Sequence, residues 1–140
     1  MVEVSVVVPV YNSEACLEEL ARQVGDALCD RTYELVLVDD QSADASWRAI
    51  KGLCARDKRI IGVRIRKNAG QDSAILCGLR RTHGRHVAIM DDDLQHSPYD
   101  IPVLLEQCEA HEWDVCYARF ARKKQAWWKN AGSWANDKLA

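Results

Sequence analysis

Four short apolar segments recur along the chain, and between them apolar residues follow helical spacing. Nearly continuous runs of β-branched and aliphatic residues are typical of strands buried on both faces of a sheet. Strands that alternate with helices predict right-handed βαβ units, an α/β class and a mostly parallel sheet with helices on both faces. The strands are expected at residues 4–9, 35–38, 61–65 and 87–90, with a fifth short strand at 114–118.

Capping residues mark the ends of the predicted helices. Asn12 or Ser13 is expected to cap the first helix and Ser42 the second. Ser97-Pro98 supplies a cap and a first-turn proline for the fourth helix, and Gly84 suits the position just after the third. The helices are expected at about residues 17–28, 43–56 and 71–82, and from residue 97 onward.

Polar or acidic residues follow three of the predicted strands. They are Pro9–Asn12, Asp39–Asp40 and Asp91–Asp93. In open parallel sheets, ligands bind outside the carboxyl ends of the strands, so these residues are expected along one rim. Their convergence predicts a ligand site there.

Three consecutive acids, Asp91, Asp92 and Asp93, directly follow the last of the four main strands. Like charges so close together repel one another unless a cation neutralises them. Mg²⁺ and Mn²⁺ prefer hard oxygen ligands and are often shared between a carboxylate or two and a substrate's phosphates. Alternate residues of an extended segment point the same way, so Asp91 and Asp93 are predicted to share one metal ion. A solvated acidic turn before Ser97 is the structural alternative.

Two other segments allow both a functional and a structural interpretation. Asp39 is a candidate to bind a ribose or a base, as acids in that place do in nucleotide folds. Asp40 and Ser42 equally suit the cap of the next helix. Asn68–Gln71 lies at a helix start, where backbone N–H groups can hold phosphate, but a simple glycine turn explains it almost as well.

The charge of the chain is unevenly distributed. The 140 residues, 48% hydrophobic and 29% charged, are typical of one globular domain, and the net charge is −2. From Arg119 onward there are six basic residues and one acid, so this end carries +5 and residues 1–118 carry −7. Such a basic end suits phosphates of a substrate or of anionic lipid. The indoles of Trp127 and Trp128 suit either a membrane interface or packing on the domain.

The cysteines and the hydropathy indicate a soluble chain in a reducing compartment. The six cysteines show no CxxC pair and no His–Cys ligand spacing, so they are interpreted as reduced core residues. The N-terminus lacks the basic leader of a signal peptide. No apolar run approaches the ~20 residues that span a bilayer.

The chain resembles family-2 glycosyltransferases of the GT-A fold, and the matching segments cover most of it in the family's order. They are VSVVVPVYN at 4–12, ELVLVDDQSAD at 34–44, NAGQDSAILCGLRRTHGRHVAIMDDDLQHSP at 68–98 and DVCYARFARKKQAWWKN at 114–130. The third segment most resembles the polyprenyl-phosphate glycosyltransferases, such as dolichyl-phosphate mannose synthases and undecaprenyl-phosphate sugar transferases.

This resemblance implies a Rossmann-like α/β/α core over residues 1–118 that binds a nucleotide sugar. It implies inverting transfer of the sugar from a UDP- or GDP-sugar to a polyprenyl phosphate, with Mg²⁺ or Mn²⁺ as cofactor. The basic, Trp-rich residues 119–140 would lead into an acceptor-binding or membrane region that is missing here. The expected partners are the donor, the lipid phosphate and a membrane surface, and nucleic acid is not expected. The full-length protein would act at the cytoplasmic face of the inner membrane.

The resemblance also assigns roles to individual residues. Asp91, Asp93 and Arg119 would be catalytic, and Asp91 and Asp93 would hold the metal as the family's DxD motif. Lys123 and Lys129 would meet phosphates of the donor or the lipid. The nucleotide-binding set would be Pro9, Tyr11, Asp39, Asp40, Gln71, Asp92 and Gln95.

Three departures from the family pattern leave an alternative open. Ser13 stands where relatives often have an acid, and Asp92 stands where they frequently have Ala. Relatives also continue well beyond the point where this chain stops, so it is expected to bind nucleotide and metal at best and to transfer sugar poorly or not at all. The alternative is a truncated or degenerate nucleotide-sugar-binding domain without transferase activity.

Three unrelated classes fit the sequence less well. A haloacid-dehalogenase phosphatase would carry its DxD near the chain start, with Thr or Val where Gln95 stands. A receiver domain would have its acidic pair after the first strand and a lone Asp after the third, which ends here in Arg66-Lys67. A dinucleotide-binding domain would have GxGxxG after the first strand, and this chain does not.

Overall fold

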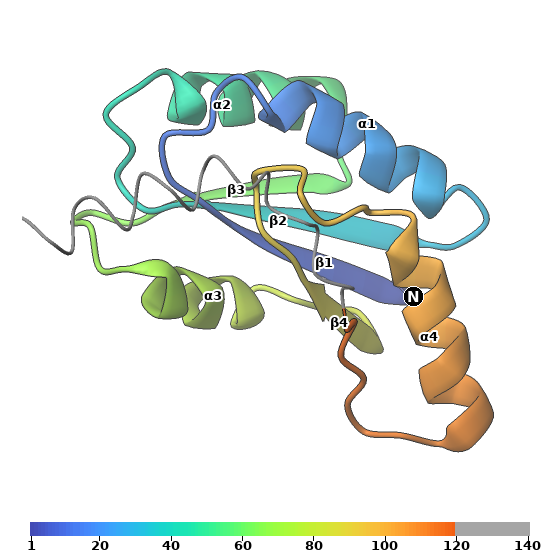
Figure 1. Ribbon diagram of the computed structural model, residues 1–140. Helices are drawn as coiled ribbons and strands as arrows, with labels where there is room; N and C mark the ends of the chain where they lie inside the picture. Colours follow the sequence, from blue (N-terminus) through green and yellow to red (C-terminus); the bar gives the residue numbers. More distant parts are fainter. Residues whose placement is uncertain (120–140) are drawn as a thin grey trace, which may run out of the picture.

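The computed structural model describes residues 1–119, in which four strands alternate with four helices (Figure 1). The strands are β1 (Val4–Val10), β2 (Tyr33–Asp39), β3 (Ile60–Arg64) and β4 (His86–Ile89). The helices are α1 (Leu17–Ala27), α2 (Ser46–Arg56), α3 (Gln71–Leu79) and α4 (Asp100–His111). The predicted alternation of strands and helices is therefore confirmed.

The sheet is parallel and its strand order is β3-β2-β1-β4. The chain builds outward from β1 to β3 and then crosses to the opposite side, where β4 pairs with β1. Helices α1 and α2 cover one face of the sheet and α3 covers the other (Figure 1). This is the predicted three-layer α/β/α arrangement. It has a topological switch between β1 and β4, the place where ligands bind in such sheets.

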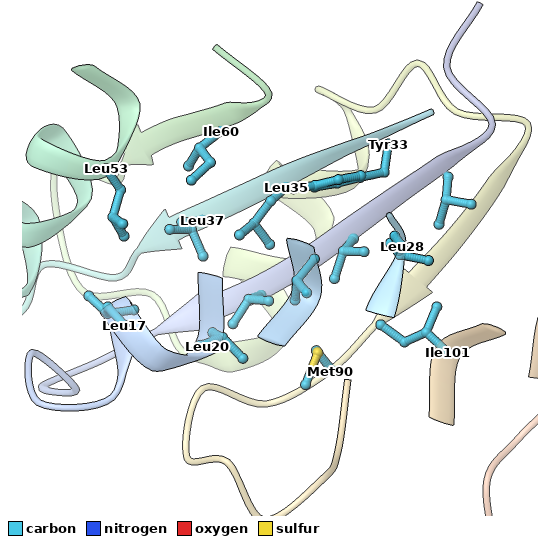
Figure 2. Close-up of a cluster of buried hydrophobic side chains, with 14 of the residues drawn as sticks. Leu17, Leu20, Leu28, Tyr33, Leu35, Leu37, Leu53, Ile60, Met90 and Ile101 are labelled. Atoms are coloured by element: carbon cyan, nitrogen blue, oxygen red, sulfur yellow. The ribbon is translucent and has the colours of Figure 1, made fainter. Parts of the chain in front are cut away.

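Alternate residues of β1 supply the core on both faces of the sheet. Val4, Val6, Val8 and Val10 share one cluster with the apolar side of α1. Figure 2 shows Leu17 and Leu20 from α1, and Met90 and Ile101 from the segments after β4, in that cluster. Val7 points to the other face and packs with Val36, Val38 and Ala74. Each fully buried aliphatic side chain contributes roughly 1.5–3 kcal/mol, so β1 stabilises the fold through both faces of the sheet.

A polar network fixes the amino ends of the strands. Ser5 Oγ and the N–H of His83 each donate a hydrogen bond of 2.6 Å to Oε1 of the buried Glu34. Burial raises the pKa of the Glu34 carboxyl, but the hydrogen bonds from Ser5 and His83 outweigh it, so the pKa lies below its ordinary value. The N–H of Gly84 donates to Ser5 Oγ at 2.8 Å. The approach is close, since a Cβ on Gly84 would lie 2.6 Å from the nitrogen of Ser5.

Several predicted helix boundaries and caps were wrong, although α1 begins at Leu17 as predicted. Helix α1 begins at Leu17 and α2 at Ser46, so Asn12, Ser13 and Ser42 do not cap them. The side chains of these three residues instead form hydrogen bonds between the loops at the edge of the sheet. Helix α3 ends at Leu79, too early for Gly84 to follow it as a cap. Ser97 and Pro98 precede α4, which begins at Asp100 after one turn.

The prediction of a fifth strand at 114–118 was also wrong, because the structure shows no strand in these residues. A strand forms by pairing with a neighbour, and none of the four described strands pairs with this segment. Its alternating apolar residues Val115 and Tyr117 are exposed. Periodicity alone therefore could not decide this element.

The six cysteines are free. The prediction that they are core residues was wrong, because none of them is fully buried. Cys29 is exposed and the other five are partly buried. Cys54 and Cys77 pack against the two core clusters from opposite faces of the sheet. Within residues 1–119, no helix is both long and apolar enough to cross a membrane.

Candidate functional site

A pocket of about 430 Å³ lies at the carboxyl ends of the strands, where the predicted rim residues meet. Its size falls in the range of small-molecule sites, roughly 300–1,000 Å³. Each strand contributes through the loop that follows it. The lining residues are Pro9, Val10, Tyr11, Asp40, Asn68, Gly70, Gln71, Asp91, Asp92 and Asp93.

The loop after β1 is bonded to the loop after β2. The N–H of Asn12 donates to Ser42 Oγ at 2.9 Å, and Asn12 Oδ1 accepts the N–H of Ala43 at 2.8 Å. The N–H of Ser13 donates to Ser46 Oγ at 2.9 Å. Asn12 has a φ of 51°, a left-handed conformation that asparagine tolerates better than most residues. The loop after β1 is therefore bonded at three points to the segment that follows β2.

Asp40 joins the loop after β2 to the loop after β3. Its carboxylate accepts the N–H groups of Ala69 and Gly70 at 2.8 and 2.9 Å, and its carbonyl accepts the side chain of Asn68 at 3.0 Å. Asp40 is 4% exposed, so these bonds compensate for the burial of its charge. Gly70, with a φ of 88°, precedes the first residue of α3. Asp40 thus fixes the N-terminus of α3 at the pocket.

Gln71 joins the loop after β3 to the segment after β4. Its Nε2 donates a hydrogen bond of 2.8 Å to Asp91 Oδ1. The ring of His96 lies near the other oxygen of this carboxylate, with Nδ1 3.9 Å from Asp91 Oδ2. Asp91 is therefore oriented from α3 as well as by its own strand.

Asp92 joins the segment after β4 back to the loop after β1. Its Oδ2 accepts the N–H of Tyr11 at 3.1 Å and also the hydroxyl of Ser13. With this contact the four loops form a closed ring of hydrogen bonds around the pocket. Each loop is bonded to the loops on both sides of it, so the ring preorganises the pocket walls.

Asp93 is held mainly within its own segment. Its Oδ1 accepts the N–H of Gln95 at 3.0 Å, which turns the chain sharply. Leu94, between them, has a φ of 59°. The segment is therefore bent rather than extended, and the expected alternation of Asp91 and Asp93 does not apply. All three acids nevertheless line the pocket.

Three predicted site residues lie in the described chain but not in the lining of this pocket. Asp39 is fully buried and accepts the N–H of Ser42 at 3.2 Å. Its other oxygen lies 3.0 Å from Nε of Arg64, an ion pair without a well-aligned hydrogen bond. Gln95 and Arg119 are exposed. Lys123 and Lys129, like the tryptophans at 127 and 128, lie outside the described residues.

Sequence reasoning missed the roles of Ser13 and Asn68. Both are small polar residues in loops, where such residues are common for many reasons. The signal that could have found Ser13 is its position directly after the rim segment Pro9–Asn12, and Asn68 lies in the short segment between the third strand and the next helix. Their partners, Asp92 and Asp40, belong to other strands and cannot be read from local sequence.

The metal ligands predicted at Asp91 and Asp93 offer the hard oxygens that Mg²⁺ and Mn²⁺ prefer. Among residues 1–119, however, no group of three or more His, Cys, Asp or Glu side chains is arranged to hold a metal ion. Mg²⁺ is commonly bound by one or two carboxylates together with substrate phosphates rather than by an all-protein cage. The donor set therefore fits a metal that arrives with a phosphorylated ligand.

The fold is similar to several solved glycosyltransferases. S. aureus TarS 1–349 in complex with UDP-GlcNAc matches with a TM-score of 0.68 and 24% identity, over 86% of this chain and 37% of that chain. The mannosyltransferase PcManGT from Pyrobaculum calidifontis, in complex with GDP-Man and Mn²⁺, matches with a TM-score of 0.59 and 27% identity, over 65% and 27%. These likenesses define the class of the chain as an α/β protein with the GT-A transferase fold.

The family model for glycosyl transferase family 2 matches residues 5–138, and the chain belongs to this family. It is 40% identical over 129 residues to the undecaprenyl-phosphate 4-deoxy-4-formamido-L-arabinose transferase of Pseudomonas aeruginosa. The corresponding transferase of Aeromonas hydrophila is 37% identical over 134 residues. The alignments cover 90% and 93% of this chain but 38% and 40% of those relatives. The chain therefore spans about two fifths of their length.

Proposed function

We propose that this chain binds the donor in an inverting glycosyltransferase that moves a sugar from a UDP- or GDP-sugar to a polyprenyl phosphate such as undecaprenyl phosphate. One observation carries the proposal. The pocket at the β1–β4 switch combines the Asp91–Asp93 acids with the end of β1, in a chain 40% identical to an undecaprenyl-phosphate sugar transferase. The solved neighbours in complex with UDP-GlcNAc or GDP-Man support a nucleotide sugar as the ligand.

The β1 side of the pocket suits the nucleoside. The exposed ring of Tyr11 and the buried Pro9 offer apolar surface to a base, and Asp40 and Gln71 add polar groups to the lining of the same pocket. Asp39, next to Asp40 in the chain, is fully buried and contacts the N–H of Ser42 and the side chain of Arg64, so we propose that it supports the nucleotide site from within.

The acidic side of the pocket suits the diphosphate. Asp91 and Asp93 would hold Mg²⁺ or Mn²⁺, with Asp92 and Gln95 beside them. The metal would neutralise the charge of the leaving nucleoside diphosphate. Arg119, Lys123 and Lys129 are proposed to meet phosphates of the donor or the lipid through their positive charges.

The proposed reaction is a single displacement. An oxygen of the acceptor phosphate forms a bond to the anomeric carbon while the bond from that carbon to the nucleoside diphosphate breaks, and the configuration inverts. The attacking oxygen belongs to a phosphate that is already anionic at neutral pH, so the reaction needs little help from a general base. The basic C-terminal part is proposed to bring the full-length protein to the cytoplasmic face of the membrane that holds the lipid.

Two measurements test this function. In calorimetry with Mn²⁺, UDP- or GDP-sugars should bind, while adenosine nucleotides and short nucleic acids should not. The nucleotide sugar that binds is then incubated with the chain and undecaprenyl phosphate in detergent. Mass spectrometry should detect the lipid-linked sugar. Failure to bind any nucleotide sugar would overturn the proposal.

A second candidate is a domain that binds nucleotide sugar without transferring it. The observation in its favour is that the predicted site residues that meet within residues 1–119 line one pocket, which the first proposal assigns to the donor alone. It predicts donor binding in calorimetry but no lipid-linked product. The two measurements therefore separate the candidates.

A further inference from the structure

We propose that Asp92 is a positioning residue that fixes the distance between the nucleoside side and the diphosphate side of the pocket. The inference rests on the proposed function and gives a role to the acid between the two proposed metal ligands. One oxygen of Asp92 accepts both the N–H of Tyr11 and the hydroxyl of Ser13. These contacts join residues 81 and 79 positions apart and link the segment after β4 to the loop after β1.

The hydrogen bonds of Asp92 differ from those of the two acids beside it. Both hydrogen bonds end on the same oxygen, Oδ2, and both come from the β1 loop. Asp91 is instead held by Gln71, and Asp93 by the N–H of Gln95. The three neighbouring acids therefore contact three different parts of the pocket.

The Asp92 contact is also the bond that closes the ring of loops. The β1 loop is already fixed to the second loop through Ser42 and Ser46. The hydrogen bond from Gln71 ties Asp91 to α3, but it does not reach the β1 loop. Without Asp92, the acidic segment would therefore lose its direct link to that loop. The position of Tyr11 relative to the acids would then vary, and a ligand that spans both sides would bind less tightly.

The test uses matched substitutions at both ends of the contact. Asp92→Ala removes the acceptor, Ser13→Ala removes one donor, and Asp92→Asn keeps an oxygen that can accept both bonds but removes the charge. Asp30→Ala is the control, because Asp30 is exposed in the segment between α1 and β2, outside the pocket lining. Circular dichroism and thermal unfolding establish that each variant folds.

The first readout requires no ligand. The amide of Tyr11 should exchange its hydrogen several-fold faster in Asp92→Ala than in wild type, and at the wild-type rate in Asp92→Asn and Asp30→Ala. Unchanged exchange in Asp92→Ala would overturn the inference even if nucleotide binds. If wild type binds no nucleotide, the proposed function fails, while this readout still decides whether the contact exists.

The second readout is affinity for UDP and GDP in the presence of Mn²⁺. Asp92→Ala should weaken binding about tenfold and Ser13→Ala by a smaller factor, as expected for hydrogen bonds to a carboxylate. The variant that combines Asp92→Ala with Ser13→Ala should bind no more weakly than Asp92→Ala alone, because the two substitutions remove the same contact. Asp92→Asn should stay within about twofold of wild type. Loss of binding in Asp92→Asn, with Ser13→Ala unaffected, would overturn the inference and show that Asp92 acts through its charge on the metal.

Discussion

Gln71, the first residue of α3, donates a hydrogen bond of 2.8 Å to Oδ1 of Asp91, which lies just beyond the end of β4. Gln71 begins the helix that leads from β3, at one edge of the sheet, to β4, at the other edge, and Asp91 follows β4. The bond orients a proposed metal ligand from a separate element. It also leaves the second oxygen of Asp91, Oδ2, on the side of His96.

We expect Gln71→Ala to weaken metal-dependent nucleotide binding more than it weakens the fold. The substitution frees Asp91 to rotate, which costs roughly 1 kcal/mol of binding for one lost hydrogen bond, or about fivefold in affinity. Calorimetry with UDP- and GDP-sugars in Mn²⁺ measures this loss. Gln107→Ala is the matched control, since Gln107 is exposed on α4, and it should bind as wild type. Equal affinity of Gln71→Ala and wild type would contradict this role.

Glu34 should make the fold sensitive to acid. Because the folded-state pKa of Glu34 lies below its ordinary value of 4.5, its stabilisation is complete above that pH and is lost as the pH falls through the folded-state pKa. Glu34→Gln should lower the free energy of unfolding by about 1–3 kcal/mol at pH 7, because the donors of Ser5 and His83 lose a carboxylate.

Urea unfolding of wild type and Glu34→Gln at neutral pH and in acid, well below the ordinary pKa of a glutamate, measures this effect. The difference between the two proteins should shrink in acid, where Glu34 of the wild type takes up a proton. A difference of the same size under both conditions would mean that the carboxylate charge does not matter.

Two glycine substitutions should have opposite effects on stability. In Gly84→Ala the new Cβ would lie 2.6 Å from both the nitrogen and Oγ of Ser5, and backbone must shift. We expect a loss of about 2 kcal/mol or more, as for other overpacked sites. In Gly52→Ala, inside α2, the Cβ meets nothing within 4 Å. The free energy of unfolding should rise by about 0.5–1 kcal/mol in this variant, because alanine has a higher helix propensity than glycine.

Thermal unfolding of the two variants beside wild type checks the prediction. A lower midpoint for Gly84→Ala and a higher one for Gly52→Ala are expected. If Gly84→Ala unfolded at the wild-type temperature, the close approach of the two chain segments at Ser5 would not be required.

The strands were predictable because their apolar runs are nearly continuous and are bounded by polar residues. Val4–Val10 and Tyr33–Asp39 are buried along their whole length, as continuous β-branched and aliphatic runs predict. The strand expected at 114–118 has a similar pattern but no partner among the described strands. Pairing is a tertiary property, so local periodicity could not supply it.

The candidate site was predictable only in part, for the same reason. Because ligands bind at the carboxyl ends of parallel strands, the sequence alone placed Tyr11, Asp40 and Asp91 on one rim. The bonds of Asp92 to Ser13 and of Asp40 to Gly70, in contrast, join residues 79 and 30 positions apart. The helix-capping preferences of Asn12 and Ser42 even pointed to the wrong partners. Only the folded chain places these groups together.

The central claim, that Asp91 and Asp93 bind a nucleotide-sugar diphosphate through a divalent metal, is tested most directly by one calorimetric comparison. UDP- and GDP-sugars are titrated into wild type, Asp93→Ala and the control Asp114→Ala, each with Mn²⁺ and with EDTA. Asp114 is exposed and outside the pocket lining. We predict binding by wild type and Asp114→Ala in Mn²⁺ only, and loss of that binding in Asp93→Ala. Equal affinity in Mn²⁺ and EDTA, or wild-type affinity in Asp93→Ala, would contradict the claim.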